Sequence, residues 1–419
     1  MQEFDLSYDI LSDILNNKTP FNEALRKVFQ THVELRPLRS SVANLVGCEL
    51  RHHHLFTYLL KEENLDASEK LYCYIAMANN FFSRRFKEEE MLNALGEKLG
   101  DEKLESVKKI LVSTGEEKSR IPESVSRSSN LYLSLRYNTP DWVLKVLEHF
   151  GFGATYKTLS KLSHPSPKTY HVCTSLTNVD AILKDPEFQK SSMDGLVSYV
   201  GKSRLNKKGV YQEGKIFEER PFSRNLIASF PIEAPKQITI YNGTPSPELA
   251  LDLIETYGEK IGLNIAVDNT DDYVAITKMI KKKDLRNVNF FSSPAASTLE
   301  SAISCKQDLV IVAPNSTNFD DIPSTPDYLL RFDKSTMDTT IANEGSSLEE
   351  ASKFVEINGK LVYVIYTISK KEGHLMVLNF LHNHPEFALD SEKQYFPYEE
   401  LGACAYLAVM TRKSETPAK

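Results

Sequence analysis

Residues 237–269 read QITIYNGTPSPELALDLIETYGEKIGLNIAVDN, and this stretch decides the fold class. It opens with a run of β-branched and aromatic residues, which predicts a short strand that the loop NGTP ends. Apolar residues then recur at helical spacing, and a second apolar strand ends at Asp268. The order strand, helix, strand predicts a parallel α/β sheet.

The loop and the acid of this unit are candidates for binding a nucleoside cofactor. The loop contains Gly243 and Pro245, and Asp268 follows the second strand. In a doubly wound sheet, an acid in this place holds a ribose, and the preceding loop holds the phosphates. The usual fingerprint has several glycines, whereas this loop has one. The pattern therefore leaves open a cofactor site and a plain βαβ unit with a surface aspartate.

Composition sets the broad class of the protein. A chain of 419 residues with a net charge of −7 predicts two or three domains and excludes a generally basic nucleic-acid binder. Its five cysteines lie far apart without metal-ligand spacing, and their odd number suits a reducing compartment. The acidic amino-terminal segment does not resemble a signal peptide, and no apolar run is long enough to cross a membrane. We therefore expect a cytoplasmic protein without a membrane partner.

Hydrophobic periodicity divides the chain into three expected domains. Residues 1–125 are dominated by amphipathic helices, and residues 126–234 mix short strands with helices. Residues 235–413 alternate strands with helices and predict a Rossmann-like sheet domain. The predicted fold class is therefore α/β, with an all-α domain and a small α+β domain ahead of the sheet.

Four further segments resemble one family in their order and spacing. They are LRPLRSSVANLVGCELRHHHLFTYLL, SLRYNTPDWVLKVLEHFG, LVYVIYTIS with LNFLHNHPEF, and FPYEELGACAYLAVMTRK. Together they resemble the RsmB/Sun-type RNA cytosine-5 methyltransferases over most of the chain. The resemblance implies a NusB-like helical domain, a middle domain, and a methyltransferase domain that uses S-adenosylmethionine.

The resemblance also implies where the chemistry should lie. The family places a nucleophilic cysteine in a Thr-Cys-Ser tripeptide and a second cysteine in a Pro-Cys-Ser tripeptide. These positions match Ile368 and Asn315, and neither side chain offers a thiolate. In the cofactor loop Pro245 is kept, while Pro247 and Glu248 replace a glycine and a lysine. We therefore expect no catalytic residue, and S-adenosylmethionine only if the altered site still functions.

Basic residues supply the candidates for RNA contact. The resemblance favours two basic clusters, because the family holds RNA between the helical and middle domains. The first cluster contains Arg39 and Arg51, and the second contains Lys202, Arg204, Lys207 and Lys208. Lysine and arginine contacts to phosphate supply most non-specific affinity for nucleic acids. The other interpretation of such runs is a solvated protein surface.

A metal site is not expected at the three consecutive histidines of the helical domain. His52, His53 and His54 lie on one predicted helix, where neighbouring side chains point in different directions. Three functions stay open from the sequence. The first is an inactive relative that binds RNA, in particular ribosomal RNA, and the second is an active RNA methyltransferase with a divergent site. The third is a protein-interaction module acting through the helical domain.

Overall fold

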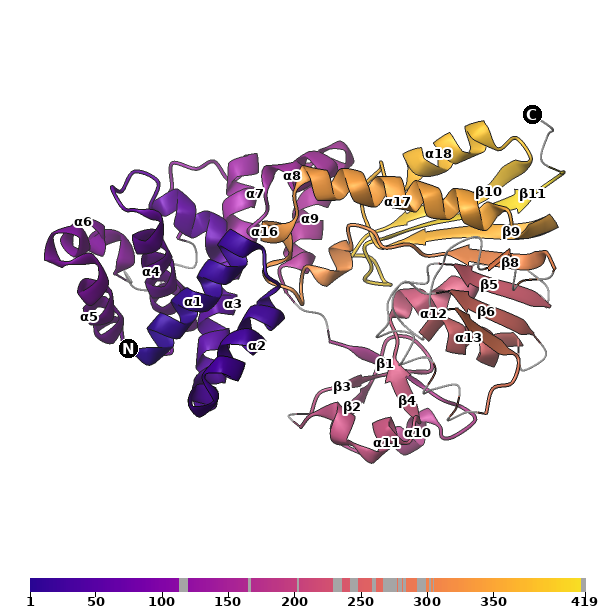
Figure 1. Cartoon of the computed structure of the whole chain (residues 1–419), viewed down its shortest axis with the longest axis horizontal. Helices are drawn as coiled ribbons and strands as arrows, with labels where there is room; N and C mark the ends of the chain where they lie inside the picture. The colour runs from indigo at the N-terminus through magenta and orange to yellow at the C-terminus, as the bar shows by residue number, and fades with distance from the viewer. Residues whose placement is uncertain are drawn as a thin grey trace. The chain divides into compact units, whose positions relative to one another are not determined.

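The stretch 237–269 contains the predicted strand, helix and strand in the computed structural model of the chain (Figure 1). Strands β5 (Gln237–Tyr241) and β6 (Gly262–Ala266) pair in parallel, and α13 (Glu248–Tyr257) lies between them in the sequence. The βαβ unit is therefore confirmed.

The structure describes residues 1–112, 120–164, 167–201, 203–228, 236–241, 248–257, 261–266, 277, 281, 284–291, 299–300, 303 and 305–415.

The large sheet has seven strands in the order β10-β11-β9-β8-β5-β6-β7. Strands β5 to β9 are parallel, and β11 pairs antiparallel with both β9 and β10. The order reverses between β5 and β8, which makes their carboxyl ends the switch point where α/β sheets bind ligands. The remaining strands are β7 (Val288–Phe291), β8 (Gln307–Val312), β9 (Val355–Ile365), β10 (Phe387–Tyr395) and β11 (Ala405–Arg412).

Helices cover both faces of this sheet (Figure 1). On one face, α12 (Pro221–Ala228) and α13 pack on side chains such as Ile240 and Val364. On the other face, α17 (Lys334–Ser352) and α18 (His374–Asn383) pack on side chains such as Val310 and Tyr363. Burial on both faces explains the continuous apolar runs at residues 309–312 in β8 and 405–410 in β11.

A small antiparallel sheet precedes the large one and has the order β2-β3-β1-β4. Its core is a separate apolar cluster that includes Tyr170, Phe188 and Val197. This sheet confirms the expected α+β segment. Its elements are β1 (Thr169–Val172), α10 (Val179–Ile182), β2 (Phe188–Lys190), β3 (Leu196–Tyr199), η4 (Leu205–Lys207), α11 (Gly209–Gln212) and β4 (Ile216–Glu218).

The amino-terminal part is helical, as predicted, and is built around the long helix α3 (Arg39–Leu59). Asp66 caps α4 in a reciprocal capping box with Glu69. The other helices are α1 (Gln2–Asn17), α2 (Phe21–Thr31), η1 (Val33–Leu38), α4 (Ala67–Met77), η2 (Ala78–Ser83), α5 (Glu88–Leu99), α6 (Asp101–Leu111), α7 (Asn130–Tyr137), α8 (Asp141–Leu147), η3 (Glu148–Phe150) and α9 (Phe152–Leu162). No described helix is long and apolar enough to cross a membrane.

The chain divides into two compact units. The helical unit contains residues 1–164 and 321–336, and the sheet unit contains residues 165–320 and 337–419. Residues 321–336 pack with the amino-terminal helices. Asp327 accepts a hydrogen bond from the Phe21 amide (3.0 Å), and Phe332 stacks on Trp142. These units do not follow the boundaries expected after residues 125 and 234, and the three-domain division stays a prediction.

Candidate functional site

The carboxyl ends of β5, β8 and β9 are the place where this fold would hold a cofactor and a substrate. The described part of this edge consists of two loops, called here the edge loops: Pro314–Asn315–Ser316 after β8, and Thr367–Ile368–Ser369 after β9. The cofactor candidates Gly243, Pro245 and Asp268 lie outside the described residues, so their roles stay predictions.

The structure brings the two edge loops together. The hydroxyl oxygen of Thr317, which follows the first loop, lies 2.7 Å from that of Thr367 in the second loop. Ile368 is completely buried, whereas Asn315 is exposed. A buried aliphatic side chain in one loop and a neutral amide in the other provide no nucleophile.

A buried carboxylate holds the edge loops in place. Glu372 accepts a hydrogen bond from the Thr317 amide (2.8 Å), and the hydroxyls of Thr317 and Thr367 lie 2.9 Å from its other oxygen. Burial, and then the charge of Glu372, raises the pKa of Glu344 to about 11. Glu344 is therefore protonated at neutral pH and can donate a hydrogen bond to Glu372. Since all four groups are buried, this network fixes the loop conformation.

One cysteine lies near this edge, but its thiol is not reactive. Cys404 precedes β11, whose Tyr406 pairs with Ile365 at the end of β9. It is completely buried, and its amide donates to Asp320 (2.6 Å). Burial, and then the negative charge of Asp320, raises the pKa of this thiol well above its usual range. A buried thiol without an accessible anion is a poor nucleophile.

The structure separates the predicted RNA-contact residues into different environments. Arg204 and Lys207 are exposed, and Lys202 lies outside the described residues. Lys208 instead forms ion pairs with Asp185 (3.0 Å) and Glu187, which raise its pKa. Sequence reasoning missed this pairing, because these acids lie more than twenty positions earlier in the chain. Lys208 is therefore already neutralised within the small sheet.

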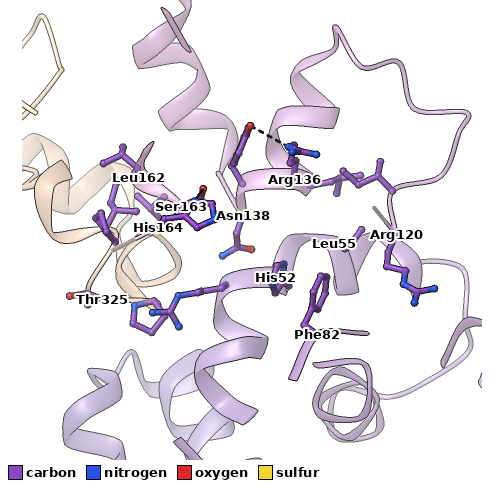
Figure 2. Close-up of a pocket in the computed structure, with 18 residues that line it drawn as sticks. His52, Leu55, Phe82, Arg120, Arg136, Asn138, Leu162, Ser163, His164 and Thr325 are labelled. Atoms are coloured by element: carbon purple, nitrogen blue, oxygen red, sulfur yellow. Dashed lines mark hydrogen bonds between the residues drawn. The ribbon is translucent and has the colours of Figure 1, made fainter. Parts of the chain in front are cut away.

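In the helical unit, Arg39 is exposed at the start of α3, and Arg51 lies on the same helix. Arg51 lines a pocket of about 370 Å³ within this unit, together with Arg120 and Arg136 (Figure 2). We call this cavity the arginine pocket. Sequence analysis identified Arg51 but neither of the other two arginines, because helix packing brings distant segments together here.

The three consecutive histidines have separate partners. His53 is 2.6 Å from Glu49, His52 stacks on Phe82, and the His54 amide donates to Asn138. Their side chains therefore do not converge on one point.

A buried charged cluster in the sheet unit escaped sequence analysis. His171 on β1 lies 2.7 Å from Glu219 and 3.5 Å from Asp252 on α13, and Arg224 donates to Asp252 (2.8 Å). Burial, and then Glu219, raises the pKa of Asp252 to about 8. The cluster connects the small sheet with the helices of the large one, and no spacing in the sequence predicts it.

Similarity to solved structures extends these observations. No protein-family model and no curated protein matches the sequence. The chain is similar to the protein PH0851 at 16% identity and a TM-score of 0.71, over 98% of this chain and 99% of that chain. It is also similar to the "Methyltransferase Homolog Protein" from Pyrococcus horikoshii at 10% identity and a TM-score of 0.55, over 67% of this chain and 98% of that chain.

A third solved structure, NSun6 from Pyrococcus horikoshii with SFG, is similar at 11% identity and a TM-score of 0.54, over 66% of this chain and 97% of that chain. At these identities the likeness concerns the fold. It confirms a Rossmann-like methyltransferase fold preceded by a helical region. The match with PH0851 extends over both compact units.

Proposed function

We propose that this protein binds RNA through a methyltransferase fold and does not methylate cytosine. The observation that carries the proposal is Ile368, a completely buried aliphatic residue at the position where the resemblance places the nucleophile. Attack on a cytosine ring needs an accessible thiolate, and neither Ile368 nor Asn315 supplies one. Cys404 does not replace it, because it is buried with a raised pKa.

Binding is the function that remains when this chemistry is absent. The fold is that of methyltransferases, and one of the similar structures is that of NSun6 with SFG. In this chain, exposed arginine and lysine residues provide contacts for phosphate; they include Arg39, Arg51, Arg204 and Lys207. Because the net charge is −7, these local clusters must supply the affinity.

The cofactor site is part of the same proposal. Pro245 and Pro247 have no backbone N–H to donate, and Glu248 adds negative charge near the carboxylate of a bound S-adenosylmethionine. We expect an affinity no tighter than about millimolar, equivalent to about 4 kcal/mol. A clear thermal shift at micromolar cofactor would favour the second candidate, an active methyltransferase with a divergent site.

The decisive experiment measures methyl transfer and RNA binding on the same purified full-length chain. Labelled S-adenosylmethionine and total RNA should give no 5-methylcytosine above a mock purification from cells that lack the chain. Filter binding should detect a complex with structured ribosomal RNA that weakens as salt rises. Label at cytosine above the mock level would refute inactivity. Absence of RNA binding at low salt would instead favour a protein-interaction module.

A further inference from the structure

The arginine pocket combines cationic, aromatic and apolar lining side chains within the helical unit (Figure 2). Its walls come from α3, η2, α7, the end of α9 and the segment that carries α16 (Tyr328–Arg331). Three arginines line it, and none of the described lining residues is acidic. A volume of about 370 Å³ falls within the usual range of small-ligand sites, about 300 to 1,000 Å³.

Two of the arginines are held without a carboxylate partner. Arg136 on α7 donates to the hydroxyls of Tyr137 (3.2 Å) and Tyr132 (3.1 Å). Arg51 on α3 donates to the Gly47 carbonyl (3.1 Å). Among the described residues, neither guanidinium has an acidic group within 4.0 Å. Both retain donors and a full positive charge for an anionic ligand.

The other side of the pocket offers a stacked aromatic pair. His52 and Phe82 lie with ring centroids 3.7 Å apart and planes 4° from parallel. Burial, and then the positive charge of Arg51, lowers the pKa of His52 to about 4, so this ring is neutral at pH 7. Phe82 remains 37% exposed and lies on a π-helical turn, a conformation frequent at functional sites. Neutral aromatic rings beside arginines suit a nucleobase next to its phosphate.

A buried asparagine joins the two helices that carry Arg51 and Arg136. Asn138 ends α7 in the left-handed conformation (φ 49°). Its side chain donates to the Leu50 carbonyl (2.6 Å) and accepts from the His54 amide (2.8 Å), so it joins α7 to α3. Because these two helices carry Arg136 and Arg51, the guanidinium groups are positioned in advance, which lowers the entropic cost of binding.

We propose that the arginine pocket binds a nucleoside phosphate, in the form of an unpaired nucleotide of RNA. Arg51 and Arg136 contact the phosphate, and the base lies against the side that carries His52 and Phe82. This assignment rests on the proposed function for the RNA source, while the pocket chemistry also fits a free mononucleotide. It gives the helical unit a binding role separate from the edge loops of the sheet unit.

The test compares full-length wild type with an Arg51→Gln/Arg136→Gln double variant and with Phe82→Leu. Arg26→Gln serves as a matched control, because Arg26 is an exposed arginine of the same unit outside the pocket. Fluorescence anisotropy measures binding of a short single-stranded RNA, and calorimetry measures AMP, CMP and inorganic phosphate. Circular dichroism checks that each variant is folded.

We expect the double variant to bind the RNA about a hundredfold more weakly, since each charged contact accounts for about tenfold. The slope of log affinity against log salt should fall by about 0.7, because the two arginines contact one phosphate of a single strand and the variant removes that contact. Phe82→Leu should weaken binding by about tenfold with an unchanged slope, because stacking carries no charge. Arg26→Gln should bind like wild type.

The outcomes separate the pocket from the proposed function. If the double variant and Phe82→Leu bind RNA as tightly as wild type does, the pocket is not the RNA-binding site. RNA binding by the protein would then still be supported. Binding of AMP or CMP that depends on the pocket, without RNA binding, would support the pocket with a free nucleotide as its ligand. Binding of inorganic phosphate as tightly as RNA would overturn the role of the base. Binding of none of these probes would overturn both proposals.

Discussion

The edge loops of the sheet unit and the arginine pocket of the helical unit differ in what they leave available to a ligand. At the edge loops, Ile368 is buried and aliphatic, and both oxygens of the buried Glu372 carboxylate accept hydrogen bonds within the protein. In the arginine pocket, Arg51 and Arg136 keep charges that no carboxylate neutralises among the described residues. Two parts of one chain can therefore differ in whether their polar groups hold the fold together or stay available to a ligand.

The largest expected effect concerns thiol access at the edge loops. Cys404 is buried with a raised pKa, whereas Cys305 is exposed. Modification of Cys404 requires local opening, which at about 4 kcal/mol slows it about a thousandfold relative to Cys305. Mass spectrometry of peptides after timed exposure to a thiol reagent measures both rates, and unfolded protein serves as the control. Equal rates in the folded protein would mean an accessible thiol near the edge loops and would revive a thiol mechanism.

The second prediction concerns the pH dependence of stability. Folding raises the pKa of Glu344 from 4.5 to about 11. The stability that this group contributes is complete below about pH 4.5 and declines as pH rises towards 11, because only the unfolded chain releases the proton in that range. Glu344→Gln removes this titration. Its free energy of unfolding relative to wild type should therefore increase by about 3 kcal/mol between pH 6 and pH 8.

Urea unfolding followed by circular dichroism at both pH values measures this difference. Glu400→Gln is the matched control, since Glu400 is an exposed glutamate of the same unit. A constant difference between Glu344→Gln and wild type across this range would show that Glu344 is ionised in the folded protein. The edge loops would then contain an unpaired charge instead of a closed network.

The smallest expected effect concerns the basic cluster of the small sheet. Lys208 is paired with Asp185 and Glu187, whereas Arg204 and Lys207 are exposed. Replacing Lys208 with Gln should leave the salt dependence of RNA binding unchanged. The Arg204→Gln/Lys207→Gln double variant should lower the slope by about 0.7 for each phosphate contact that it removes. Filter-binding salt titrations measure both slopes. A lower slope in the Lys208 variant alone would mean that RNA displaces its acidic partners.

Local patterns predicted the elements of the fold, because strands and helices follow from the spacing of neighbouring residues. The β5–α13–β6 unit and the long helix α3 are examples. The edge loops were located through the resemblance, and the structure brings them together through Thr317 and Thr367. The predicted boundary after residue 125 does not coincide with a compact unit, since helices α7 to α9 pack with the amino-terminal helices.

Contacts between distant segments account for what the sequence did not reveal. Arg136 approaches Arg51 only because α7 packs on α3 through Asn138. Similarly, the pairing of Glu344 with Glu372 depends on how α17 meets the loop before α18. Neither pairing has a periodicity or a motif that could signal it. Lys208 is a further example. The sequence suggested an RNA contact at this residue, but acids from an earlier segment neutralise its charge.

The hydrogen bonds of Asn138 also have a consequence for selectivity. A side chain that joins two helix backbones fixes how far apart those backbones lie, which limits the region that both guanidinium groups can reach together. An anionic group that enters this region gains both contacts, whereas one held outside it gains one at most. Selection among anions would then depend on where the ligand places its charged group, and total ligand charge would matter less.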